Sequence, residues 1–213
     1  MTTFVSLFRG INVGGHQAVR MDALKELHES LGLQDVATYI QSGNVVFTSD
    51  DPDVTRIQKD IEDGFAQKFG FQVKVMVRTA DEFNVMIENN PFQNQPMKES
   101  KWVVAMFLAS HPISTAREDI QKTYTGPEEL QIIGQEVYIY YPEGIGRSKL
   151  TNTFLEKKLK TTGTARNWNT VLRLQQMMQG YVPSILLLQS HRWLCQNSKL
   201  CSLMVIAAMI GSV

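Results

Sequence analysis

The sequence predicts an α+β protein made of two ferredoxin-like subdomains, each with the element order β-α-β-β-α-β. Two observations lead to this prediction. Short runs of β-forming residues alternate with patterns that place apolar residues on one helix face, and a similar order of helices and hairpins occurs twice in 213 residues. We expect subdomains at residues 1–90 and 91–180, packed together, with short antiparallel hairpins and C-terminal helices, followed by an atypical apolar extension at 181–213.

The first subdomain begins with a buried strand at residues 2–8, "TTFVSLF". Apolar residues at positions 21, 24, 27 and 31 then recur at the spacing of one helix face, and Gly32 ends that helix. The runs "VATYI" and "NVVFT" flank "QSG", which predicts a tight hairpin in which Gly43 has a positive φ. Asp53 can cap a second helix, which Gly70 ends, and the alternating residues 71–77 predict the last strand.

The second subdomain follows a short helix that begins at Thr79 and a linker rich in Asn and Pro, "NNPFQNQP". A buried strand at 102–108, a helix at 115–124 and a hairpin at 130–141 are predicted next. Ser148 is expected to begin a further helix, and Thr164 to cap the last one. The order of elements echoes the first half while residue identity does not, and an old duplication is one explanation.

The chain after Gly180 contains no acidic residue and closes on "SLMVIAAMIGSV". This apolar run is too short for a membrane-spanning helix, which needs about 20 residues. It either packs as an extra helix or is foreign to the fold, as an altered reading frame or a fusion scar would be. We favour the second interpretation because an exposed apolar terminus promotes aggregation.

Composition is that of an ordinary globular protein, with 43% hydrophobic and 20% charged residues and a formal net charge of zero. No global field therefore attracts nucleic acid or a membrane. Two cysteines near the C-terminus and four scattered histidines form no disulfide framework or zinc motif. With no signal-peptide pattern, we expect a cytoplasmic protein without a cofactor, a metal or a membrane partner.

The neutral net charge conceals an asymmetry. Residues 50–63 carry six acids against two bases, whereas residues 147–173 carry seven bases against Glu156 alone. Such a run can be merely a solvated face, or it can mark a surface that meets an anion.

Four segments carry candidate ligand-binding residues. "RGINVGG" (9–15) is neither GxGxxG nor a P-loop and does not open a helix, so it is either a wide glycine turn or a loop that lets backbone amides approach a ligand. "QSGN" lies at a hairpin tip, where amides and hydroxyls are also common for backbone reasons. "GRSKL" and "TARNWN" are expected to place cations at helix starts, against the helix dipole. The candidate residues are Arg9, Asn12, Gly14, Gly15, Gln41, Ser42, Asn44, Ser148, Lys149, Arg166 and Asn167.

No catalytic machinery is evident in the sequence. The four histidines have no serine or cysteine motif beside them, and G-x-S-x-G and H-E-x-x-H are absent. Paired carboxylates occur only in the exposed second helix and in "PEEL".

Four motifs in order, "LFRGINVGG", "YIQSGNVVF", "YYPEGIGRSKLTN" and "TARNWNTVLRL", resemble the bacterial family catalogued as domain of unknown function 1697, over about residues 1–179. The resemblance implies a compact α+β protein with ferredoxin-like subdomains and implies no activity. The segment after Gly180 departs from the family pattern.

Two functional hypotheses remain. The first is a binding module for an anionic partner, either a nucleotide-like or other phosphorylated small molecule or, with less support, a nucleic-acid backbone. The second is an enzyme acting on a phosphorylated or carboxylated metabolite in a cleft between the subdomains. The absence of aromatic stacking platforms argues against nucleic acid, and the absence of a visible general base argues against an enzyme. Under the first hypothesis, all four segments border one shared polar site.

Overall fold

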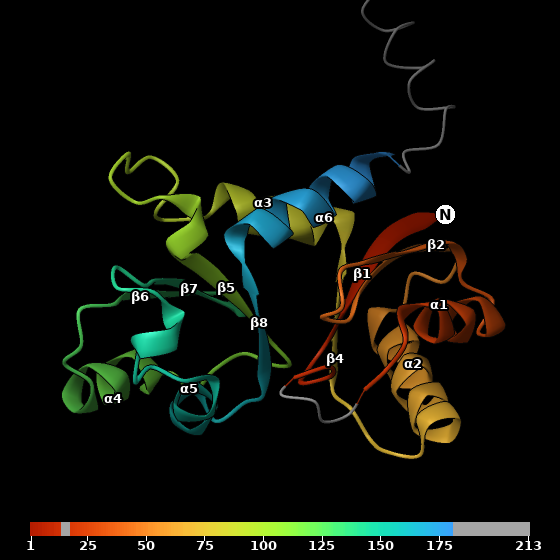
Figure 1. The fold of residues 1–213 in the computed structure, drawn as a ribbon, viewed down its shortest axis with the longest axis horizontal. Helices are drawn as coiled ribbons and strands as arrows, with labels where there is room; N and C mark the ends of the chain where they lie inside the picture. Colours follow the sequence, from red (N-terminus) through yellow and green to blue (C-terminus); the bar gives the residue numbers. More distant parts are fainter. Residues whose placement is uncertain (14–17, 181–213) are drawn as a thin grey trace, which may run out of the picture. The chain divides into compact units, whose positions relative to one another are not determined.

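A computed structural model describes residues 1–13 and 18–180 of the chain (Figure 1). The first half contains β1 (Thr2–Phe8), α1 (Met21–Ser30), β2 (Gln34–Tyr39), β3 (Asn44–Ser49), α2 (Val54–Phe69) and β4 (Val75–Thr79). The second half contains β5 (Val103–Leu108), α4 (Ala116–Thr123), β6 (Glu129–Ile133), β7 (Glu136–Tyr140), α5 (Asn152–Leu159) and β8 (Gly163–Asn167). Each half continues into one more helix, α3 (Ala80–Glu88) and α6 (Trp168–Gly180).

Both halves have the ferredoxin-like topology that the sequence predicts. Each sheet has four antiparallel strands, in the order β2-β3-β1-β4 and β6-β7-β5-β8. The first strand of each unit is central, paired with the third strand on one side and the fourth on the other. A central strand is buried on both faces, which explains why residues 4–8 and 103–108 are apolar almost without interruption.

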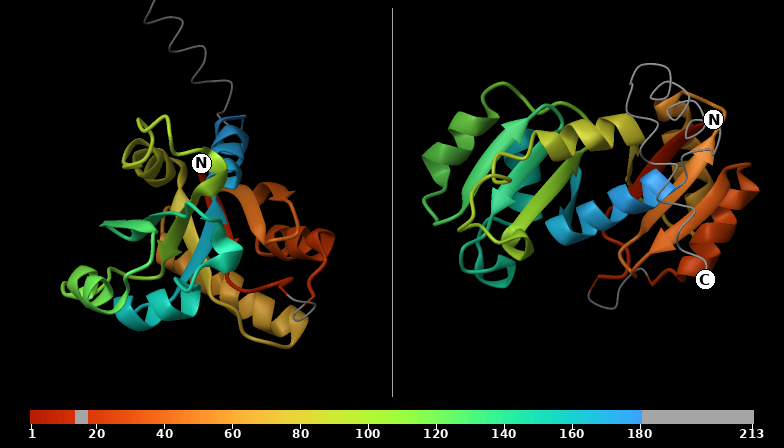
Figure 2. Two further views of the ribbon diagram at one scale, coloured as in Figure 1. Left: turned by 60° about the vertical axis from the view of Figure 1, so that its left-hand side comes forward. Right: turned by 90° about the horizontal axis from the view of Figure 1, so that it is seen from above.

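Helices cover both faces of the sheets. In the first half, α1 and α2 pack against one face through a core that contains Phe4, Phe47 and Phe65. The helices α3 and α6 lie side by side, and α6 contacts β1 and β3 of the first sheet as well as β5 and β8 of the second (Figures 1 and 2). The sheet face that stacks bases in ferredoxin-like RNA-binding domains is therefore occupied by helices in this protein.

Several local signals act as the sequence predicts. The Asp53 carboxylate accepts hydrogen bonds from the backbone N–H groups of Thr55 and Arg56, and Gly70 ends α2 with a φ of 78°. Thr79 and Glu82 form a reciprocal capping box at the start of α3.

Three predicted boundaries are wrong. The strand predicted at 71–77 begins only at Val75. Ser148 does not cap a helix, because Thr151 is the residue whose side chain caps α5. Thr164 does not cap one either: it lies in β8, paired with Phe107, and α6 begins at Trp168. A Thr followed by a helical pattern is locally an N-cap signal, but β5 needs a second neighbour, and residues 163–167 supply it.

The helices in the described part of the chain include none long and apolar enough to cross a membrane. Met1–Gly180 forms one compact unit. The subdomain boundary near residue 90 stays a prediction, and the proposed extension at 181–213, with both cysteines, lies outside the described residues.

We expect a chain that ends at Gln179 to melt within a few degrees of the full chain and to be more soluble. The reason is that α6 and both sheets are formed by residues up to Gly180. Differential scanning calorimetry of the two chains checks this. Loss of a cooperative transition in the shorter chain would show that the missing residues belong to the core.

Candidate functional site

Arg166 connects two of the four candidate segments, TARNWN and QSGN, and also contacts Phe8, the residue just before RGINVGG. Its side chain leaves β8 and reaches the end of β1 and the β2–β3 loop of the other half. Its Nη2 group donates to the carbonyl oxygens of Phe8 (2.9 Å), Ser42 (3.0 Å) and Gly43 (3.3 Å). Its Nε–H donates to Asn44 Oδ1, and Nη1 donates to Thr164 Oγ1 and the Ala165 carbonyl.

These contacts give Arg166 a structural role. A guanidinium has five N–H donors, and the acceptors above account for all of them, so none is left for a ligand. The residue is only 7% exposed. Burial lowers the pKa of Arg166 to about 10, so the group still carries its charge at neutral pH. The expectation that Arg166 lies in the first turn of a helix is wrong, as described above.

The amides near Arg166 are also used internally. Asn44 is fully buried, and its Nδ2 group donates to the Tyr39 carbonyl and to Ser42 Oγ. Asn12, at a positive φ of 58°, holds its own loop by bonding the backbone of Val19 and the carbonyl of Gln41. The side chains of Asn12 and Asn44 therefore stabilise the loops to which they belong.

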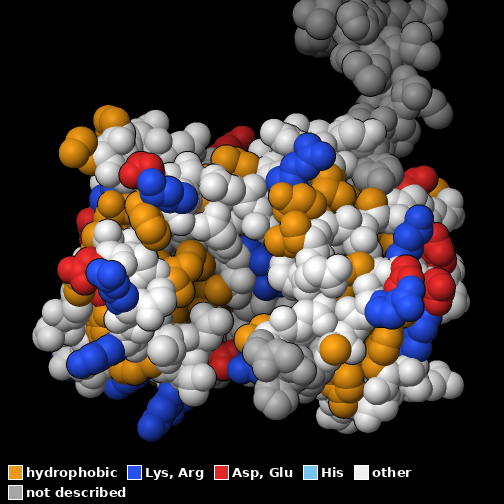
Figure 3. Space-filling model, in the orientation of Figure 1, with side chains coloured by type: hydrophobic (Ala, Val, Ile, Leu, Met, Phe, Trp, Pro, Cys, Tyr) orange, Lys and Arg blue, Asp and Glu red, His pale blue; other side chains and the backbone are white. Residues whose placement is uncertain are grey.

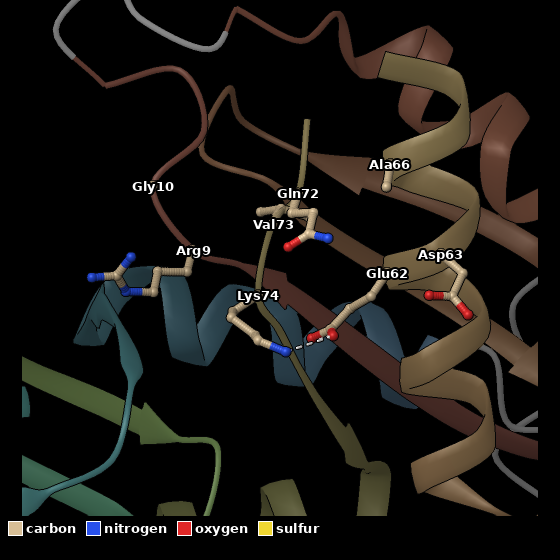
Figure 4. Close-up of a pocket in the computed structure, with 8 residues that line it drawn as sticks. All are labelled: Arg9, Gly10, Glu62, Asp63, Ala66, Gln72, Val73 and Lys74. Carbon is tan, nitrogen blue, oxygen red and sulfur yellow. Dashed lines mark hydrogen bonds and ion pairs between the residues drawn. The ribbon is translucent and has the colours of Figure 1, made fainter. Parts of the chain in front are cut away.

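Arg9 forms an ion pair between the two halves. Its guanidinium donates to both carboxylate oxygens of Glu156 on α5, each at 2.7 Å, and this contact raises the pKa of Arg9. Arg9 and Gly10 also line a cavity of about 480 Å³ beside α2 (Figure 4). In that cavity the Arg9 side chain points away from Lys74, whose ammonium pairs with Glu62 at 3.0 Å.

The GRSKL segment lines a different cavity, which we name the GRSKL pocket. Its volume is about 520 Å³. Two side chains of the pocket, Tyr124 and Phe154, have ring centroids 5.8 Å apart. The lining residues are Thr123, Tyr124, Thr125, Gly126, Pro127, Glu128, Glu143, Arg147, Ser148, Lys149 and Phe154.

Hydrogen bonds occupy the interior of the GRSKL pocket. Tyr124 donates its hydroxyl to Glu128 and lies 3.4 Å from Ser148 Oγ. Burial alone would raise the pKa of Glu128, but hydrogen bonds from Ser148 and Tyr124 outweigh it and hold that pKa below its usual value. Burial raises the pKa of Tyr124, and the hydrogen bond to Glu128 raises it further. At neutral pH the pocket therefore holds a carboxylate and a protonated phenol.

The cations between Arg147 and Arg173 lack carboxylate partners among the residues that the structure describes. Every Lys and Arg of the described chain from Arg9 to Lys101 forms an ion pair, whereas none of the seven from Arg147 to Arg173 pairs with a described carboxylate. Figure 3 shows Lys and Arg side chains gathered over α4 and α5, at its lower left. The charge run seen in the sequence is thus a run of cations without a carboxylate partner in residues 1–13 and 18–180.

Three of the four segments contribute described candidate residues to different cavities, so one site shared by all four stays a prediction. Arg9 lines the cavity beside α2, Asn12 and Gln41 line a shallow one near α1, and Ser148 and Lys149 line the GRSKL pocket. Asn167 donates to the Lys101 carbonyl, away from these cavities' linings. Gly14 and Gly15 lie outside the described residues. Ligand binding by the candidate residues stays a prediction.

Sequence reasoning missed Tyr124 and Phe154, whose aromatic rings belong to patterns that looked like helix packing. Glu128 carried a signal, since "PEEL" was noted for its paired carboxylates. Among the residues that the structure describes, no cluster of three or more His, Cys, Asp or Glu side chains could hold a metal ion. His28, buried in the first half, is hydrogen-bonded to Ser6 and to the Leu24 carbonyl, and burial lowers its pKa to about 4.

The fold and the pocket define an α+β protein of two ferredoxin-like units, with a polar pocket built within the second. The chain belongs to the family described as protein of unknown function (DUF1697), whose model matches residues 1–138. That match ends before the GRSKL and TARNWN segments, which the sequence motifs placed inside the family. The chain also resembles a solved structure, that of the conserved bacterial protein SP0830 from Streptococcus pneumoniae. The two share 24% identity and a TM-score of 0.67, over 83% of this chain and 98% of that chain, a likeness that shows the fold alone. No curated protein matches the chain.

Proposed function

We propose that this protein binds a nucleotide-like anionic small molecule in the GRSKL pocket. The observation that carries the proposal is the position of Arg147 and Lys149 at a cavity of about 520 Å³, with no described carboxylate paired to either. Unpaired cations beside a cavity of this size favour a phosphate or carboxylate group as ligand.

The remaining lining of the pocket narrows the class of ligand. Two cations and two carboxylates, Glu128 and Glu143, give the lining a formal charge of zero. A ligand with both a negative group and hydrogen-bond donors therefore suits the pocket better than a simple anion. The rings of Tyr124 and Phe154 add a surface on which a planar base can stack. A nucleotide combines these three features. The expected site for its action is the cytoplasm, where such ligands are abundant.

Replacing Lys149 with alanine should weaken nucleotide binding at least tenfold and leave the melting temperature nearly unchanged. Lys149 is exposed and makes no ion pair with a described residue, so the fold loses little with it. Isothermal titration with AMP, ATP and inorganic phosphate measures the affinity, and a thermal melt measures stability.

Lys157→Ala is the matched control, because it removes the same charge from an exposed position on α5 outside the pocket lining. It should bind nucleotide like the parent chain. An equal loss of nucleotide affinity in both variants would mean that only the overall charge matters. No nucleotide binding by the parent chain would contradict the proposal.

An enzyme acting on a phosphorylated or carboxylated molecule is the second candidate. The observation in its favour is that Tyr124, Glu128 and Ser148 contact one another in the same pocket as the cations. The pKa directions argue for binding instead: a lowered pKa makes Glu128 a weaker base, and a raised pKa keeps Tyr124 protonated. Turnover of a bound nucleotide, measured as the release of inorganic phosphate, would favour the enzyme over the binding protein.

A further inference from the structure

Arg78 and Arg166 occupy equivalent positions in the two halves. Each is the fourth residue of the fourth strand of its unit, β4 or β8. Arg78 Nη2 donates to the carbonyl of Leu108, the last residue of β5, at 2.9 Å. Arg166 Nη2 donates to the carbonyl of Phe8, the last residue of β1, also at 2.9 Å. Each half thus contributes one arginine that donates a hydrogen bond to the central strand of the other half.

The equivalence extends to the third strand of each unit. Arg166 Nε–H donates to Asn44, the first residue of β3, and Arg78 Nε–H donates to Glu136, the first residue of β7, at 3.0 Å. The chemical difference is one of charge. Arg166 meets a neutral amide, whereas Arg78 meets a carboxylate that balances its charge.

The hairpin tips next to the two arginines differ in length. Residues 40–43 connect β2 to β3, and they bring the Ser42 and Gly43 carbonyls to Arg166. Only residues 134–135 connect β6 to β7. The acceptors of Arg78 among the described residues are Glu136 and the carbonyls of Val77 and Leu108.

Arg78 is consequently a buried arginine with spare donors. Three of its five N–H groups have an acceptor in the described part of the chain, and the residue is only 9% exposed. It lines a cavity of about 310 Å³, the Arg78 cavity, together with Val85, Met86, His111 and Gln135. Gly134 and Gln135, the two residues of the shorter hairpin tip, line this cavity as well.

We propose that the Arg78 cavity binds a small neutral molecule that presents a carbonyl oxygen, such as a carboxamide or a peptide-like amide. Buried N–H groups without acceptors are costly, so an acceptor at this position is stabilising. Arg166 shows that neutral oxygens satisfy a guanidinium in this setting. A further anion is disfavoured, because Glu136 already balances Arg78 and Glu82 adds a second carboxylate to the lining. The cavity is at the small end of the range of ligand sites.

The test uses N-methylacetamide and acetate as matched neutral and charged probes of similar size. Side-chain ¹H–¹⁵N spectra of the full chain report on each arginine Nε–H, and the Arg78→Lys variant assigns the Arg78 resonance. N-methylacetamide should shift the Arg78 resonance in a saturable way and leave that of Arg166 in place, while acetate shifts neither.

A blocking variant keeps the test independent of the stability of Arg78→Lys. Val85 lines the cavity and is 55% exposed, so Val85→Trp can fill the space without entering the core. This variant should lose the response, whereas Met97→Trp, at an exposed position outside the lining, should retain it. An equal response to acetate, or no response to either probe in the parent chain, would overturn the proposal. Neither result affects nucleotide binding in the GRSKL pocket.

Discussion

Replacing Arg166 with methionine should lower the free energy of unfolding by about 2–6 kcal/mol, because it leaves two acceptors in the other half without their donor. Without the guanidinium, Asn44 Oδ1 and the Ser42 carbonyl lose the donors that now serve them. The Phe8 carbonyl keeps the Thr164 hydroxyl, at 3.2 Å. Two orphaned groups, at about 1–3 kcal/mol each, account for the expected loss.

Urea denaturation followed by circular dichroism measures this loss. Arg173→Met is the control: Arg173 is exposed on α6 and bonds only Gln176 among the described residues, so its loss should stay within about 0.5 kcal/mol. Arg166→Lys should fall between the two, because an ammonium has three donors and cannot reproduce the planar fork. A loss below about 1 kcal/mol for Arg166→Met would contradict the structural role of this side chain.

Replacing Gly43 with alanine should destabilise the protein by about 2–4 kcal/mol, through backbone strain together with overpacking. Gly43 has a φ of 70°, where a residue with a side chain is strained. In addition, a Cβ at this position would lie 2.6 Å from Ile11 Cδ1 and 2.7 Å from Phe8 Cβ. Both neighbours are buried, so neither can move away freely.

Gly70→Ala separates the two contributions. Gly70 has a φ of 78°, but nothing lies within 4 Å of a Cβ placed there, so its substitution carries the conformational cost alone, about 1 kcal/mol. Thermal and urea unfolding of both variants should show the larger loss at Gly43. Equal losses would mean that the Ile11 and Phe8 side chains yield to the new methyl group.

Local patterns were sufficient for most of the fold. The apolar run at residues 2–8, the one-sided helix patterns and the glycine turns each express a constraint that acts within a few residues, and each led to the correct element. The β-α-β-β-α-β order of the first half and its partial echo in the second then indicated the fold class, because few topologies accommodate it, although β8 was predicted as the start of a helix. The family resemblance agreed with this outcome.

The candidate site could be predicted only in part. Arg9, Asn12, Asn44 and Arg166 were recognised as polar residues that local packing does not require. In the structure they connect loops and the two halves through hydrogen bonds and an ion pair. A single sequence cannot distinguish a polar side chain kept for a ligand from one kept for a distant carbonyl, because both leave the same local pattern.

The sequence by itself determined the two ferredoxin-like units, the positive-φ turn at Gly43 and the concentration of cations after residue 146. Only the tertiary structure decided that Arg166 lies in a strand, that Tyr124 and Phe154 share a pocket with Lys149, and that Arg78 keeps spare donors. The physical reason is the separation along the sequence of the groups that interact. Helix patterns, caps and turns depend on neighbours within about four residues. Strand pairing, cavities and contacts between the halves depend on groups that are distant in the sequence, 122 residues apart for Asn44 and Arg166.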